Sequence, residues 1–519
     1  MDRRSLALAS LSGLLLAASF PSPDLGFLAW ISIVPLLLSL QGRSPKQGFL
    51  LGGLTGILYF GGTISWVTNS VHFYGHIPLI PASFITLLLC AYCALYPAMF
   101  GMIIAQVRRR RPGMLLLAAP AAWTALELAR THVFSGFPWA LLGYSQYRFL
   151  PLIQIADITA VYGVSFLIVL TNASLAGIIE DRKRVAPLLA CLAVLGASAG
   201  YGALRLQEQT EGQPLRVAVV QGNIEQDKKW DQAYQAEVIG TYERLTREAV
   251  RSRPDLVIWP ETATPFYFGG AERNDPGLTS DLRSFVRTTG TPLLTGSPYY
   301  ERRPDRTYVL RNSAYLLDRD GSTAAVYHKL HLVPFGEYVP LKNLLFFVEK
   351  MVQAIGDFQT GAERTVMELG GREGERSVAF STVICYEIIF PDLVRSFVDR
   401  GARVMTTITN DAWFGRTAAP RQHFAMSVFR AVENRVPVAR AANTGVSGFI
   451  DARGRILAAT DIFTEAFLVR DLVPAGGNRT FYTRFGDVFA WLCATAILVL
   501  LALPAQTDHS PRRGADPDT

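Results

Sequence analysis

Long apolar stretches restrict this sequence, more than any other feature, to a membrane-spanning fold. A helix needs roughly 20 residues to cross the hydrocarbon core of a bilayer. Stretches that approach this length lie at residues 6–20, 24–41, 48–68, 79–107, 113–131, 158–179, 186–204 and 484–504. The sequence therefore predicts a multi-pass α-helical bundle of about eight spans, seven before a long polar segment and one after it.

Basic residues are concentrated in alternate breaks between these stretches. They are Arg3, Arg4, Arg43, Lys46, Arg108 to Arg111, Arg182, Lys183, Arg184, Arg512 and Arg513. The other breaks, at 21–24, 69–78 and 132–157, contain a single basic residue, Arg148. Because positive loops stay in the cytoplasm, we expect both termini there and the polar segment on the opposite side. The formal charge of +7 is thus a topology signal and does not indicate nucleic-acid binding.

The polar segment, residues 205–483, alternates strand-like and helix-like patterns. We expect strands at 215–220, 256–259, 292–295, 313–317, 378–384 and 404–408, and helices at 232–251, 278–289, 391–400 and 420–435. Such alternation is typical of a layered α/β domain with a mixed sheet. The expected organisation is a helical part at 1–204, an α/β domain at 205–483, a last span at 484–504 and a disordered tail at 505–519.

Cys385 is the only cysteine of the α/β domain. The other four cysteines, Cys90, Cys93, Cys191 and Cys493, lie within apolar stretches. A lone cysteine after a strand is usually a core residue. Here, however, Tyr386 and Glu387 follow directly, and an acidic group at the end of a buried strand is costly unless the strand opens onto a site. Cys385 is therefore a candidate nucleophile.

A thiol nucleophile needs a base and a group that stabilises the oxyanion. Glu261 ends the strand-like run 256–259, and Lys329 follows Tyr327 and His328. Each residue alone is weak evidence, because a carboxylate after a strand is often a solvated residue and a lone lysine is usually on the surface. Together with Cys385 they supply the chemistry of acyl transfer.

The order Glu261, Lys329, Cys385 resembles the nitrilase (carbon-nitrogen hydrolase) superfamily over residues 215–473. Longer motifs narrow this resemblance to bacterial apolipoprotein N-acyltransferases. They are HLVPFGEYVP at 331–340, ICYE at 384–387, NDAWFG at 410–415, NTGVSG at 443–448, FPW at 137–139 and GYSQ at 143–146. The arrangement of seven spans before the domain and one after it agrees with that family.

The resemblance implies an αββα sandwich for the α/β domain and a role for seven residues. Glu261 would be the general base, Lys329 the oxyanion-stabilising cation and Cys385 the nucleophile. The residues implied to support the site or bind substrate are Trp230, Glu337, Tyr386 and Glu387. No cofactor or metal is implied, and the pairs His72/His76 and His328/His331 lack further ligands at the spacing of a zinc site.

The resemblance also implies the reaction. An acyl chain would pass from a membrane phospholipid to a thioester on Cys385. It would then pass to the α-amino group of the N-terminal diacylglyceryl-cysteine of an apolipoprotein, in the last step of lipoprotein maturation. The location implied is the bacterial inner membrane, with the catalytic domain in the periplasm.

Two other functions remain open from the residues alone. A membrane-anchored hydrolase of a small amide or nitrile would use the same three side chains, although an anchor needs only one span. A transporter would need ionisable residues within its spans, where Glu127, close to Arg130, is the main candidate.

One patch also has two interpretations. It consists of Phe346, Phe347, Val348, Met351 and Val352. It is either a buried helix or a lid that dips into the membrane and admits acyl chains.

Overall fold

The computed structural model describes residues 1–183, 185–209, 211–229, 231–268, 275–305, 307–338, 358–371 and 377–504. Four features of the sequence analysis lie outside these residues. They are Trp230, Arg184, the patch at 346–352 and the tail at 505–519.

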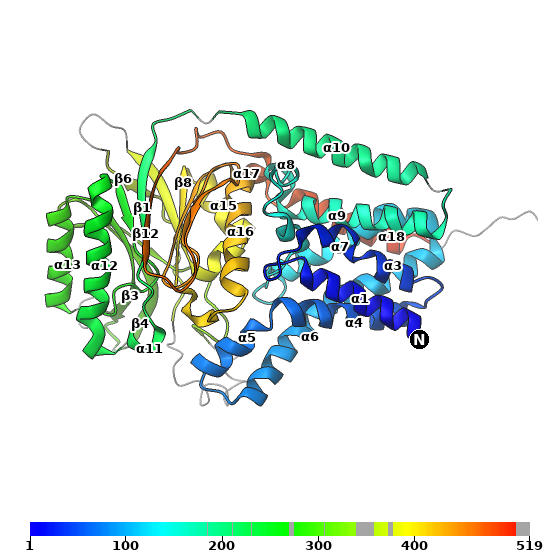
Figure 1. Cartoon of the computed structure of the whole chain (residues 1–519), viewed down its shortest axis with the longest axis horizontal. Helices are drawn as coiled ribbons and strands as arrows, with labels where there is room; N and C mark the ends of the chain where they lie inside the picture. Colours follow the sequence, from blue (N-terminus) through cyan, green and yellow to red (C-terminus); the bar gives the residue numbers. More distant parts are fainter. Residues whose placement is uncertain are drawn as a thin grey trace, which may run out of the picture.

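Apolar helices form one half of the molecule and two β-sheets form the other (Figure 1). The helices of the first half are α1 (Arg3–Ala18), α2 (Ala29–Ser32), α3 (Val34–Ser39), α4 (Pro45–Thr63), α5 (Trp66–Asn69), α6 (Leu79–Arg110), α7 (Leu115–His132), α8 (Leu150–Ile153), α9 (Ala156–Glu180), α10 (Val185–Gln207) and α18 (Val488–Ala502). By length and composition, four helical segments in the described residues could cross a membrane: Leu79–Arg110, Pro112–His132, Ala156–Glu180 and Val185–Gln207. A fifth is added if the bent pair Pro45–Thr63 and Trp66–Tyr74 forms one span.

The structure therefore supports a membrane-embedded helical region but does not confirm the count of eight spans. Three of the expected spans form shorter helices, because α1 has 16 residues, Gly26–Ser39 is broken and α18 has 15. Proline explains the break in the second stretch. Pro35 lies in the first turn of α3, where its missing N–H is tolerated, and so a new helix begins there instead of continuing α2.

Small residues bring α4 and α6 into close contact. A Cβ atom added to Gly101 would lie 2.2 Å from the carbonyl oxygen of Gly48, and one added to Gly52 would lie 2.1 Å from that of Pro97. Gly48 and Gly52 are four residues apart and share one helix face. This is the small-residue packing that lets membrane helices approach closely.

The second half is a sandwich of two six-stranded sheets. The first has the order β12-β1-β2-β3-β4-β5 and the second β11-β10-β9-β8-β7-β6. The strands are β1 (Leu215–Gln221), β2 (Leu256–Ile258), β3 (Leu293–Arg302), β4 (Tyr308–Leu317), β5 (Thr323–His328), β6 (Met367–Leu369), β7 (Val378–Ile384), β8 (Val404–Thr409), β9 (Val438–Ala442), β10 (Gly448–Ile450), β11 (Ile456–Ala459) and β12 (Ala466–Leu472). Strands β1 to β3 run parallel, as do β7 to β9.

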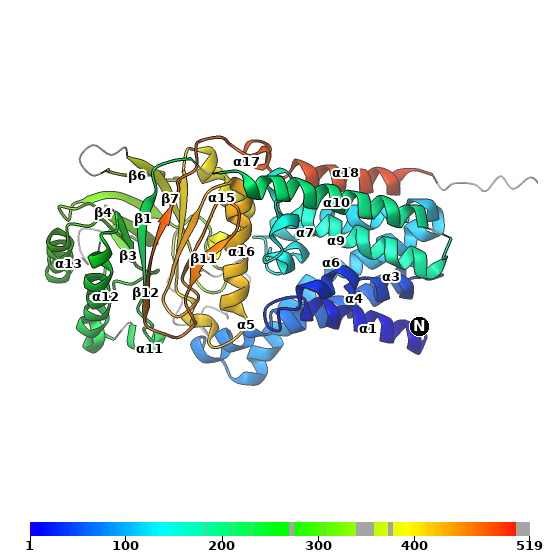
Figure 2. The same cartoon turned by 45° about the horizontal axis from the view of Figure 1, so that its top comes forward.

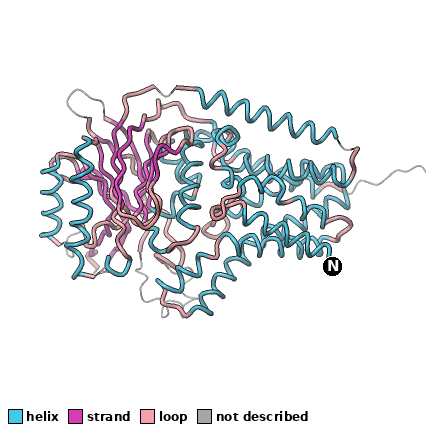
Figure 3. The backbone as a smooth tube through the Cα atoms, viewed as in Figure 1, coloured by secondary structure: helices cyan, strands magenta, loops and turns pink. Residues whose placement is uncertain are grey.

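Helices cover both outer faces of this sandwich (Figures 2 and 3). Helices α12 (Gln235–Ala249) and α13 (Pro276–Thr289) lie on the first sheet, and α15 (Pro391–Asp399) and α16 (Ala419–Asn434) on the second. The short helices are α11 (Gln226–Lys229) and α17 (Phe481–Phe485). This layering confirms the expected αββα fold, and it places α16 between the second sheet and the membrane helices.

Buried polar side chains join α16 to the helical half. Gln422 accepts a hydrogen bond from Trp139 Nε1 at 2.7 Å and donates to the carbonyl of Pro21 at 2.7 Å. Arg435, just after α16, pairs with Asp157 of α9 at 2.8 Å. Because buried polar groups need such partners, these contacts fix the position of the sandwich on the bundle.

Basic residues from several breaks between the helices lie together at the opposite end of the bundle. Arg43 pairs with Asp2, and Arg108 pairs with Glu180 at 2.6 Å. Arg111 donates to the carbonyl of Pro504 at 2.6 Å. The N-terminus, the 40–46 turn and the ends of α6, α9 and α18 therefore lie together, at the end of the bundle away from the sheets (Figure 1).

Candidate active site

The structure brings together three of the predicted residues at the ends of three strands. Glu261 follows β2, Lys329 follows β5 directly and Cys385 follows β7 directly. Their exposed fractions are 6%, 1% and 8%. Lys329 Nζ lies 3.7 Å from Glu261 Oε1, and the charges of both residues act on the Cys385 thiol. A carboxylate, an ammonium and a thiol thus share one buried site.

Two carboxylates surround the ammonium of Lys329. Its Nζ lies 2.9 and 3.0 Å from the two oxygens of Glu337, and Glu261 lies on another side. Burial alone would lower the pKa of Lys329, but Glu337 and Glu261 outweigh burial and hold the pKa above its usual value. Lys329 therefore stays a cation, as an oxyanion-stabilising group must.

The carboxylate of Glu261 is held by donors on both oxygens. Oε1 accepts from Asn312 Nδ2 at 2.7 Å, and Oε2 accepts from the main-chain N–H of Asn410 at 2.8 Å. Asn312 Nδ2 also donates to Glu337 Oε1 at 2.8 Å. Asn312 was not predicted from the sequence, where it is one polar residue within strand β4. Its amide couples the two carboxylates that flank Lys329.

Cys385 begins the 3₁₀ turn η7 (Cys385–Ile389) with a φ of +54°. Left-handed backbone is costly for a residue with a Cβ and is concentrated at functional sites. Burial raises the pKa of the Cys385 thiol well above its usual value, and the carboxylate of Glu261 raises it further, while Lys329 offsets part of the rise. The resting thiol is therefore protonated, so the site needs a base to activate it.

Glu387 links the strand that carries Lys329 to the strand that carries Cys385. It is fully buried. Oε1 accepts from Tyr327 Oη at 2.8 Å and from the main-chain N–H groups of Leu330 and His331 at 2.7 and 3.0 Å, while Oε2 accepts from the N–H of Ile384 at 2.7 Å. Burial raises the pKa of Glu387 to about 7, against these donors, which favour the carboxylate. Glu387 thus fixes the ammonium relative to the thiol.

Tyr386 connects the site to the helical half. Its hydroxyl donates to the carbonyl of Gly136 at 3.2 Å, in the loop after α7. Its ring packs edge-on against the ring of Phe390, with 5.1 Å between the ring centroids. A loop of the membrane region therefore touches the residue next to the candidate nucleophile.

Sequence reasoning missed a buried polar group behind Cys385, formed by His423, Arg440 and Asp411. His423 Nε2 lies 3.2 Å from the Cys385 carbonyl oxygen, and its Nδ1 lies 3.0 Å from Arg440 Nη2 and 3.1 Å from Asp411 Oδ1. Because a carbonyl only accepts, Nε2 carries the proton. Arg440 pairs with Asp411 at 2.8 Å, and all three side chains are fully buried. Only Asp411 lies in a recognisable motif, so the sequence held no signal for His423 or Arg440.

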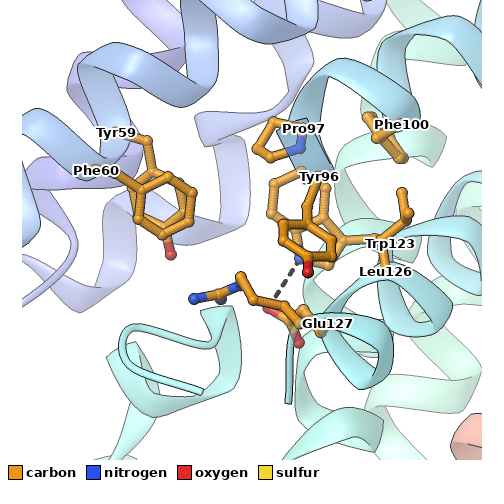
Figure 4. A pocket seen from close by; sticks show the side chains of 9 residues that line it. Tyr59, Phe60, Tyr96, Pro97, Phe100, Trp123, Leu126 and Glu127 are labelled. Carbon is orange, nitrogen blue, oxygen red and sulfur yellow. Dashed lines mark hydrogen bonds between the residues drawn. The ribbon is translucent and has the colours of Figure 1, made fainter. Parts of the chain in front are cut away.

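Glu127 and Arg130, the charged pair of the helical region, hold a loop in place. Glu127 and Arg130 line a small pocket in the bundle with Tyr59, Phe60, Tyr96 and Trp123 (Figure 4). Glu127 Oε1 accepts from Trp123 Nε1 at 3.0 Å and from the N–H of Leu142 at 2.7 Å. Arg130 donates to the carbonyls of Phe137, Trp139 and Ala140. Both charges therefore hold the 137–142 loop, which does not favour the transporter interpretation.

Comparison with known proteins identifies the family. The family model of the apolipoprotein N-acyltransferase N-terminal domain matches residues 12–174, and that of the carbon-nitrogen hydrolases matches residues 216–479. The apolipoprotein N-acyltransferase of Geobacter metallireducens is 45% identical over 97% of this chain and 96% of its own length. That of Methylococcus capsulatus is 36% identical over 96% of both chains.

A solved structure of a nitrilase-superfamily member is similar to part of this chain. This member of branch 10 from Saccharomyces cerevisiae covers 50% of this chain and 91% of its own, at 18% identity and a TM-score of 0.39. The full-length relatives and the two matching family models show that the chain belongs to the apolipoprotein N-acyltransferase family of the nitrilase superfamily.

Proposed function

We propose that this chain acylates the N-terminal amino group of a lipid-modified apolipoprotein with an acyl chain from a phospholipid, through a thioester on Cys385. The observation that carries the proposal is the buried group of Glu261, Lys329 and Cys385, in a chain whose full-length relatives are apolipoprotein N-acyltransferases.

In the first step Glu261 accepts the thiol proton and the Cys385 sulfur attacks the ester carbonyl of the phospholipid. A C–S bond forms, and the negative charge on the carbonyl oxygen is stabilised by the ammonium of Lys329. The ester C–O bond then breaks, and Glu261 returns the proton to the departing glycerol oxygen. The products are a lysophospholipid and the acyl-enzyme.

In the second step the neutral α-amino group of the apolipoprotein attacks the thioester carbonyl. The C–N bond forms, the C–S bond breaks, and Glu261 moves one proton from the amine to the cysteine sulfur. Burial of Cys385 at 8% exposure limits the access of water, which would otherwise hydrolyse the thioester. Hydrolysis of a small amide or nitrile, the alternative reaction, would need water at this stage.

Glu337, Glu387 and Tyr386 support this chemistry in our proposal. Glu337 keeps Lys329 charged, Glu387 fixes the ends of β5 and β7, and Tyr386 anchors the loop of the membrane region. Trp230 stays a predicted residue that supports the site or binds substrate.

We further propose a topology. The helical part at 1–204 and the span at 484–504 would lie in the bacterial inner membrane, with both termini and the tail at 505–519 in the cytoplasm. The catalytic domain at 205–483 would lie in the periplasm. The gathering of Arg43, Arg108 and Arg111 at the end of the bundle away from the site supports this orientation.

The topology is tested with a membrane-impermeant maleimide on spheroplasts. A cysteine at the exposed Asp320 should be labelled, and one at the exposed Lys183 should be labelled only after lysis. Labelling in the reverse order would contradict the proposed orientation.

The acyl-enzyme is tested with the purified full-length protein and phosphatidylethanolamine vesicles. Mass spectrometry should find an acyl mass on the peptide that contains Cys385, and none on the Cys385→Ala variant. Adding a diacylglyceryl-cysteine peptide should move this mass to the peptide's amino group. Release of free fatty acid without transfer would support the hydrolase instead.

The base is tested in the same experiment. Glu261→Gln should slow adduct formation without loss of lipid binding, because an amide cannot accept the thiol proton. Glu225→Gln, at a side chain that is 76% exposed, is the matched control and should react normally. A normal rate in the Glu261→Gln variant would remove Glu261 from the base role.

A further inference from the structure

Lys229 is a second buried lysine at the site, and none of the steps above uses it. It ends helix α11 and is 1% exposed. Its Nζ donates to the main-chain carbonyl of Glu261 at 2.9 Å. Among the described residues, no carboxylate oxygen lies within ion-pair distance of this ammonium. A buried ammonium with one neutral partner is costly, and a cost of this kind is often retained for function.

The segment that carries Lys229 is held by the residues that hold the base. Asn410, whose N–H donates to the Glu261 carboxylate, also donates through Nδ2 to Gln226 Oε1 at 2.7 Å. Asn443 binds both the N–H and the carbonyl of Ile224, just before α11. Lys229 and Glu261 are therefore positioned by one hydrogen-bonded network that spans both sheets.

The charges of the site explain what a second cation would do. When Glu261 has taken the thiol proton, the thiolate of Cys385 and the carboxylate of Glu337 face only one cation, Lys329. Glu337 already neutralises much of that cation at 2.9 Å. In a buried site an uncompensated negative charge is strongly unfavourable. A second ammonium would make the cluster neutral, both before and after the proton moves from Cys385 to Glu261.

We propose that Lys229 is a positioning residue of this active site, which holds the main chain of Glu261 and supplies the second positive charge that the Cys385 thiolate requires. This inference rests on the proposed roles of Glu261 and Cys385.

The titratable groups that face Lys229 agree with this role. They are Glu261 and Cys385, with Lys329 and Glu337 beyond Glu261, whereas Asp227 on its own helix is exposed. Burial lowers the pKa of Lys229 to about 7, and the negative charges of Glu261 and Cys385 oppose this change. The negative charge that Glu261 and Cys385 share, whichever of the two residues carries it, therefore favours the charged form of Lys229.

Alkylation of Cys385 by iodoacetamide at a series of pH values tests the proposal in the full-length protein. The reaction is followed by mass spectrometry of the peptide that contains Cys385. Lys229→Gln keeps a donor for the Glu261 carbonyl and removes the charge. Because a nearby charge shifts a pKa by about 1–3 units, the alkylation pKa should rise by about one unit or more, and the rate near pH 6, where Lys229 is charged, should fall about tenfold.

Two variants serve as comparisons. Lys228→Gln changes the neighbouring lysine, which is 44% exposed, and should leave the alkylation profile unchanged. Lys229→Arg keeps the charge, so its shift should be less than half that of Lys229→Gln. An unchanged profile in a folded Lys229→Gln variant would overturn the proposal. If that variant does not fold, a rise of about one unit or more in the alkylation pKa of a folded Lys229→Arg variant, which keeps the charge, would overturn the proposal.

The alkylation assay separates this proposal from the proposed function, because it needs no lipid. A wild-type protein that forms no acyl adduct, together with a shifted alkylation profile in Lys229→Gln, would refute the acyl transfer and support the role of Lys229. A normal acyl adduct in the wild type, together with an unshifted alkylation profile in Lys229→Gln, would support the acyl transfer and refute the role of Lys229.

Discussion

Replacing Glu387 by glutamine is the sharpest test of how the site is held together. The carboxylate accepts four hydrogen bonds, from the side chain of Tyr327 and the main chain of Ile384, Leu330 and His331. Glutamine has nearly the same shape, but its amide nitrogen cannot accept. If the amide oxygen keeps the three donors of Oε1, the amide nitrogen must face the N–H of Ile384.

The structure gives the size of the effect. Two buried donors are left unpaired, the N–H of Ile384 and one N–H of the new amide. Each costs about 1–3 kcal/mol, so the substitution should cost about 2–6 kcal/mol. Ile384 directly precedes Cys385, whose φ of +54° this contact helps to hold. With about 1.4 kcal/mol for each factor of ten, acyl-adduct formation should slow by about 30-fold or more.

The assay is the rate of acyl addition to Cys385 with phosphatidylethanolamine vesicles, together with the apparent melting temperature in detergent. Glu368→Gln makes the same change at an exposed position on β6 and should alter neither quantity. If Glu387→Gln forms the adduct at the wild-type rate and melts at the wild-type temperature, Glu387 does not fix the site as argued.

Three further substitutions probe other parts of the molecule. Asn312→Leu removes the amide that donates to Glu261 at 2.7 Å and to Glu337 at 2.8 Å. A hydrogen bond to a charged group contributes about 1.5–3 kcal/mol, so acyl addition should slow by about 10- to 100-fold. A normal rate would contradict this role of Asn312. Gln422→Leu leaves the indole N–H of Trp139 unpaired in the interface; the cost of about 1–3 kcal/mol should lower the melting temperature, and an unchanged value would show that the contact is dispensable. Burial and the charge of Lys329 lower the pKa of His331 to about 4, so the unfolded chain binds more protons than the folded one between pH 6.5 and 4, and stability is lost as the pH falls through this range. In the His331→Gln variant the melting temperature should fall less steeply over the same pH range. An equal slope in both proteins would exclude His331 as the source of the loss.

The strands that were predicted from the sequence are those rich in β-branched and aliphatic residues, such as β1, β7 and β8. Those missed depend on tertiary pairing. Strand β9 is fully buried but contains Arg440, whose charge is paired within the core. Strand β12 has an apolar run at 466–469 followed by Arg470 and Asp471, and Asp471 pairs with Arg216 across the ladder. Residue patterns cannot show such partners before the fold is known.

The candidate site shows the same limit. Glu261 and Cys385 could be found because each follows an apolar run, where a polar residue stands out, and Lys329 because the motif at 331–340 that follows it resembles the family. Asn312 lies within a strand, and Lys229 ends the polar run 226–229, which is typical of a solvated turn. Their burial arises from the second sheet and from segments far away in sequence.

The contacts of the site explain why this catalytic sandwich is fused to a bundle of membrane helices and not merely anchored by one. Arg130 and Glu127 hold the 137–142 loop from within the bundle. That loop presents Trp139 to Gln422 on α16, and one residue further along, His423 binds the carbonyl of Cys385. A second route runs from Gly136 to Tyr386. The apolar helices therefore position the main chain of Cys385 from two sides, so in our proposal the thiol that attacks a lipid ester is aligned by the part of the protein that lies in the lipid.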